Sequence, residues 1–134
     1  MRRVAPWVLA VLLIVATTSA YGHDMASMKT TPPQAVSLSG EIIEPQCYFS
    51  HGSQGIDHAS CAVICAKGGQ SLAFLESKTR KVYPLIAQGH GENPNKLVIA
   101  HIGMPVAVKG RVFSRDGNAV LFVESISEVK GGRR

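Results

Sequence analysis

The sequence lacks the residue patterns that mark common catalytic centres. It has no serine nucleophile elbow and no glycine-rich phosphate loop after a strand. Only nine acidic residues are present, and they include no pattern typical of paired general acid–base carboxylates. A C-x-x-C pair and the C-x-x-C-H motif of c-type haem proteins are also absent, which disfavours redox and haem chemistry. These absences favour a binding protein over an enzyme.

The excess of positive over negative charge lies at the two ends of the chain. Lys and Arg number 14 against nine acidic residues, but two of the arginines lie at positions 2 and 3. Without those two the count falls to 12, and the net charge falls from +5 to +3. Residues 130–134 form a basic tail that carries three of the remaining positive charges. The body of the chain is therefore close to neutral, which argues against a nucleic-acid partner.

No apolar run is long enough to serve as a stable membrane anchor, since a spanning helix needs about 20 apolar residues. The run over residues 4–16 is shorter, follows two arginines and precedes small residues at 17–20. This order predicts a cleaved signal peptide over residues 1–22. The segment contains no cysteine for a lipid anchor. We therefore expect a periplasmic or secreted protein.

Alternating apolar and polar residues predict a mainly β domain over residues 36–129. A polar, Pro-Pro-containing segment at 23–35 precedes it and is expected to be a flexible leader. We expect Leu38, Val108 and Leu121 to point inward. The five predicted strands cover residues 36–42, 70–76, 81–87, 104–114 and 119–126.

Two short helices are predicted between these strands. Asp57 is suited to cap a helix over residues 58–67, which a Gly-Gly pair would close. Asn93 is suited to cap a second helix, which would begin at Pro94 and end at Gly103.

Five strands with a helix between the third and the fourth resemble the order of an OB-fold barrel. The segments VSLSGEII, KVYPLIA, MPVAVKGRVF and AVLFVESI are similar to those of small exported bacterial OB-fold domains. Gly40 and Gly110 fit places where barrel strands coil sharply. The resemblance implies a five-stranded OB-fold-like barrel with two short helices. It also implies that residues 45–69, an unusually long insert between strands one and two, flank the usual ligand face.

The insert contains all three cysteines, Cys47, Cys61 and Cys65, together with His58. On a helix, His58, Cys61 and Cys65 would share one narrow face, and Cys47 could complete the set from the preceding loop. One imidazole and three thiolates suit tetrahedral zinc or copper(I). A helix N-terminus would favour the thiolate form. The sequence therefore predicts a Cys3His metal site, although H-x2-C-x3-C is not a standard zinc-finger spacing.

The same cysteines also permit other interpretations. A disulfide from Cys47 to Cys61 or Cys65 would pin the insert to the barrel and leave one thiol free. The protein would then be a structural module that contacts another envelope protein, or a thiol redox partner. A ligand role for His51 in place of His58 is a further alternative. The leading hypothesis is an exported binding protein whose partner is a copper or zinc ion.

Overall fold

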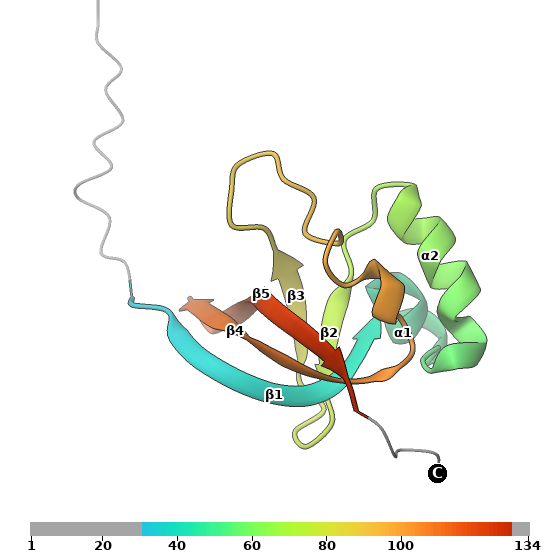
Figure 1. Cartoon of the computed structure of the whole chain (residues 1–134), viewed down its shortest axis with the longest axis horizontal. Helices are drawn as coiled ribbons and strands as arrows, with labels where there is room; N and C mark the ends of the chain where they lie inside the picture. The colour runs from blue at the N-terminus through green and yellow to red at the C-terminus, as the bar shows by residue number, and fades with distance from the viewer. Residues whose placement is uncertain (1–30, 130–134) are drawn as a thin grey trace, which may run out of the picture.

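The computed structural model describes residues 31–129 of the chain (Figure 1). The predicted signal peptide, most of the predicted leader and the basic tail lie outside these residues. Between residues 31 and 129, no helix is long and apolar enough to cross a membrane.

Five strands form a closed barrel in the order β1-β2-β3-β5-β4, with β4 pairing back onto β1. The β3–β5 pairing is parallel and the others are antiparallel. This arrangement is compatible with an OB-fold and confirms the predicted fold class. The strands are β1 (Gln34–Ile43), β2 (Ala73–Glu76), β3 (Val82–Ile86), β4 (Pro105–Arg115) and β5 (Asn118–Glu128).

The barrel interior is filled by the apolar residues that alternate along the strands. Val108 and Leu121 are fully buried in the main core, and Leu38 is half-buried and packs against it. All three predicted inward positions therefore contribute to the core, with Leu38 nearer its edge. Phe74, Ile42 and Val106 are among the other fully buried members.

Gly40 and Gly110 lie where two strands approach too closely for a side chain. A Cβ at Gly40 would collide with the carbonyl oxygen of Leu75 and the ring of Phe74. A Cβ at Gly110 would collide with the carbonyl oxygen of Phe122, at a register shift between β4 and β5. Both glycines thus allow the strands to close into a barrel, as the sequence predicted.

Both α-helices belong to the connection between β1 and β2, and they lie together at one side of the barrel (Figure 1). Helix α1 (Pro45–His51) was not predicted. A 3-10 turn, η3 (Ile56–His58), leads directly into α2 (Ala59–Lys67), which confirms the predicted helix within one residue. The predicted Asp57 cap is wrong, because His58 is the N-cap residue of α2 and makes no side-chain cap hydrogen bond.

The predicted helix from Pro94 to Gly103 is also wrong, since that segment forms turns and one 3-10 element, η4 (Ile99–His101). The side chain of Asn95 explains the difference. It is buried, accepts the N–H of Leu72 at 2.9 Å and donates to the carbonyl of Gln70 at 2.7 Å. These bonds tie the segment to the chain that enters β2, and tight turns replace a regular helix.

Truncation of Leu121 should destabilise the protein strongly, because its side chain fills the barrel interior. We expect Leu121→Ala to lower the free energy of unfolding by about 2–5 kcal/mol. Leu97 is 47% exposed, so the matched change Leu97→Ala should alter the free energy of unfolding by about 0.5 kcal/mol or less. Urea unfolding of both variants measures these values. Equal effects of the two substitutions would contradict the barrel core.

Candidate metal centre

Helix α1 places Cys47 in its first turn. Pro45 occupies the first helical position, where its missing N–H costs nothing, and Gly52 ends the helix with a φ of 69°. The Glu44 carboxylate caps the start by accepting the N–H groups of Gln46 at 2.8 Å and Cys47 at 2.7 Å. Since Glu44 directly follows β1, this cap fixes Cys47 relative to the barrel wall.

His58 is placed by a loop that is bound to the barrel at Gly55. The N–H of Gly55 donates to the Glu41 carboxylate on β1. The Gly55 carbonyl lies so close to Gly103 that any side chain at position 103 would collide with it. The 3-10 turn η3 follows at once and ends at His58. Contacts on both sides of the loop therefore determine where the imidazole lies.

Helix α2 presents Cys61 and Cys65 because its other side packs against the core. Ala62 and Ala66 are buried in the main core cluster. Cys61 is exposed and Cys65 is half-buried. The small alanine side chains let the helix approach the barrel closely, and the cysteines lie along its free edge.

The structure brings together three of the four predicted ligands. The Sγ atoms of Cys47 and Cys61 and a ring nitrogen of His58 all lie within 4.8 Å of one another. In a tetrahedral zinc site with Zn–S bonds of about 2.3 Å, two sulfurs lie about 3.8 Å apart. Small side-chain rotations would therefore bring these donors to coordination distances.

Cys65 is not a member of this three-residue group. It lies close to the group, because it follows Cys61 by one turn of α2 and the neighbouring Cys61 thiol contributes to its raised pKa. The predicted shared face assumed one continuous helix from His58 onward. His58 instead ends a 3-10 turn, which winds more tightly than an α-helix and changes the direction of its side chain relative to Cys65.

The imidazole of His58 has an unsatisfied nitrogen. Its Nε2 atom is buried and has no hydrogen-bond partner among residues 31–129. Buried polar atoms in native proteins nearly always have a partner, and an exception calls for an explanation such as an ion. A metal bound between His58 and the two sulfurs is such an explanation.

The Glu44 carboxylate controls the electrostatics around Cys47. Its hydrogen bond with the Cys47 thiol, together with desolvation, raises the pKa of Cys47 to about 11. Cys47 lies in the first turn of a helix, but a carboxylate already occupies that N-terminus, so the pKa of the Cys47 thiol is not lowered there. Desolvation and the neighbouring Cys61 thiol likewise raise the pKa of Cys65. Burial raises the pKa of Glu44 itself, but the N–H groups of Cys47 and Gln46 outweigh it, so the net pKa is lowered.

Glu44 is the residue that the sequence interpretation missed. It is 2% exposed, although glutamate is seldom buried without a partner. A glutamate directly before a proline, at the end of a strand and three residues ahead of a cysteine, could have indicated a helix cap. Its burial beside the thiols depends on the tertiary fold, and no local pattern reveals it.

The other histidines among residues 31–129 lie outside the group. His51 is exposed at the end of α1, and His90 is exposed in the loop after β3. His101 lies at the end of η4, with its Nδ1 3.5 Å from the Glu128 carboxylate. Tyr48 packs against a small core cluster, whereas Phe49 is 71% exposed and does not cover the core.

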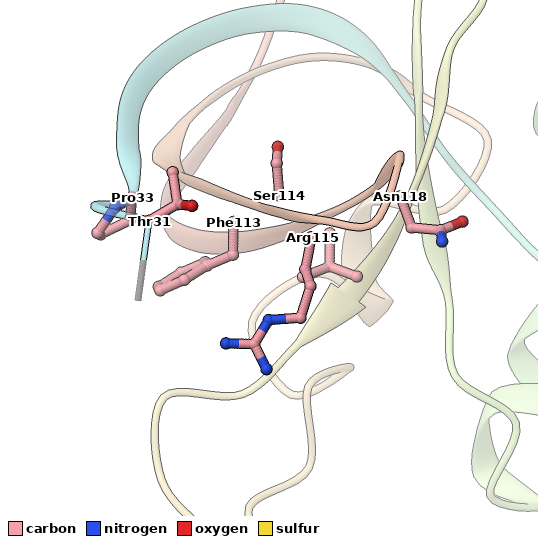
Figure 2. Close-up of a pocket in the computed structure, with 7 residues that line it drawn as sticks. Thr31, Pro33, Phe113, Ser114, Arg115 and Asn118 are labelled. Atoms are coloured by element: carbon pink, nitrogen blue, oxygen red, sulfur yellow. The ribbon is translucent and has the colours of Figure 1, made fainter. Parts of the chain in front are cut away.

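A separate pocket lies near the start of β1, whereas the insert follows the end of β1. The pocket is beside the β4–β5 hairpin (Figure 2). Its volume is about 490 Å³. Phe113, Pro33 and the guanidinium of Arg115 border it (Figure 2). The described lining contains no cysteine, histidine or carboxylate, so its chemistry is unrelated to that of the insert.

No known protein family, curated protein or solved structure matches this chain. The chemistry of the insert must therefore be inferred from its own residues.

Proposed function

We propose that this protein is a small exported binding protein that holds a zinc or copper ion in its insert. The observation that carries the proposal is the convergence of donor atoms of Cys47, His58 and Cys61 within 4.8 Å of one another. The buried Nε2 atom of His58, which has no partner among residues 31–129, adds support. These three donors come from three separate elements, α1, η3 and α2. Three separate elements of the insert thus each supply one donor to the same place.

The donor types restrict the ion that would bind. Two thiolates and an imidazole suit zinc and copper, whereas calcium and magnesium prefer oxygen ligands. We propose Cys65, one turn after Cys61 on α2, as the fourth donor of the loaded site. Cys61 is exposed, so one edge of the site faces solvent. An exposed ligand favours a protein that receives and releases its metal by ligand exchange.

The alternative in which the cysteines staple the insert has less support. Within the described residues, which include all three cysteines, no disulfide is formed. The insert is already fastened by other contacts, among them the Arg80 guanidinium, which donates to Gln54 at 2.9 Å and to the Tyr48 hydroxyl at 3.3 Å. A staple would also leave the buried nitrogen of His58 unexplained.

Removal of the His58 imidazole distinguishes metal binding from a disulfide between the cysteines. Zinc at a hundredfold excess over its Kd should raise the unfolding free energy of the protein by about 2.7 kcal/mol. We expect His58→Ala to lose this gain, because one of the three converging donors is missing. His51→Ala is the matched control, since it removes an exposed imidazole outside the group, and it should keep the full gain. Thermal melts with and without zinc measure both.

Two results would contradict the metal site in that experiment. One is a His58→Ala variant that binds zinc and copper as tightly as the parent. The other is a parent protein whose melting temperature neither metal changes. The staple would be supported by a different result. In that case the melting temperature is the same with and without metal, but falls when a disulfide between Cys47 and one other cysteine is reduced.

Export predicts that the mature protein is smaller than the precursor. Removal of residues 1–22 should lower the molecular mass of the product by about 2 kDa and release it into the soluble periplasmic fraction, as signal-peptide cleavage implies. Cell fractionation with mass spectrometry of the intact protein measures both. A product of 14.3 kDa that stays with the membrane would refute the export prediction and leave the metal site untouched.

A further inference from the structure

Glu44 is a buried carboxylate with no cation beside it. Its side chain is 2% exposed. The ion pairs among residues 31–129 do not include it, so no Lys or Arg nitrogen in that range lies within 4.0 Å of its oxygens. Its two oxygens accept backbone N–H groups at 2.8 Å and 2.7 Å, a geometry that favours the charged form. A buried negative charge of this kind is costly unless a positive charge lies nearby.

His58 lies close to Glu44, and both residues line the same small cavity. The Nε2 atom of His58 is buried and has no acceptor among the described residues. An imidazole that binds a metal does so through a nitrogen without a proton and therefore adds no formal charge.

The formal charges around the site favour a cation with two positive charges. Thiolates at Cys47 and Cys61 and the carboxylate of Glu44 together carry three negative charges, and His58 contributes none. A divalent ion would leave one negative charge uncompensated, whereas copper(I) would leave two. A thiolate at Cys65 would increase the excess equally in both cases.

We infer that the Glu44 carboxylate, through its charge, raises the affinity of the site for a divalent ion such as zinc relative to its affinity for copper(I). The inference rests on the proposed metal site and assigns Glu44 a role in its selectivity. Glu44 acts from outside the coordination sphere, because its oxygens are already held by the N–H groups of Gln46 and Cys47. It is also not a member of the converging donor group.

The test compares the affinities for zinc alone and for copper(I) alone. The protein is expressed from the complete sequence, so that any natural processing occurs, and is then reduced and titrated against competing chelators. Glu44→Gln should weaken zinc binding by about 10–100-fold, the usual effect of losing a residue that supports metal ligands. Copper(I) binding should weaken by less than about threefold or become tighter, because the charge excess has been removed.

Glu92→Gln is the matched control. Glu92 also accepts a backbone N–H, that of Gly89, but it lies in the loop after β3, outside the insert, and is not a member of the donor group. Its neutral variant should leave the ratio of zinc to copper(I) affinity unchanged. The same change of ratio in both variants would overturn the assignment to Glu44.

A second pair of variants covers the case in which Glu44→Gln does not fold. Aspartate and asparagine are equally good helix caps and differ in charge. Glu44→Asn should therefore show a lower ratio of zinc to copper(I) affinity than Glu44→Asp. Equal ratios in this pair, or equal weakening of both metals by Glu44→Gln, would overturn the selectivity. Loss of both metals from the parent protein would instead refute the proposed metal site itself.

Discussion

The hydrogen bonds from the start of α1 to the Glu44 carboxylate connect the barrel to the candidate site. Within the four residues 44–47, directly after the end of β1, they begin the helix and set the position of Cys47. The same carboxylate is buried against the thiols and raises the pKa of Cys47. The fold thereby places a negative charge beside the candidate donors and holds it there through the N–H groups of Gln46 and Cys47.

The barrel contributes a rigid frame from which the donors are presented. Cys47 is held through Glu44, His58 through the contacts of Gly55, and Cys61 through the buried face of α2. Sites that rest on such supported elements keep their geometry better than sites on free loops. A helix insert at the end of β1 also leaves Cys61 accessible, which a protein that exchanges its metal requires.

Much of the fold was predictable because burial in a barrel imposes a period of two on each strand. The strand segments and the inward residues followed from that rule, whereas Gly40 and Gly110 were recognised as glycines inside strands, at places where a barrel strand coils sharply. The helix from Pro94 did not form because the Asn95 side chain binds the chain near β2, a contact between distant segments. The ligand set was recognisable from residue type and proximity in sequence. The 3-10 turn at His58 and the burial of Glu44 arise from packing, and so the exact grouping could not be predicted.

The coordination of zinc in the loaded protein tests the central claim most directly. X-ray absorption at the zinc edge measures the type and distance of the ligand atoms. The account predicts one nitrogen at about 2.0–2.1 Å and two or three sulfurs at about 2.3 Å, with the nitrogen contribution lost in His58→Ala. A spectrum that shows only nitrogen and oxygen ligands would contradict a metal site built from Cys47, His58 and Cys61.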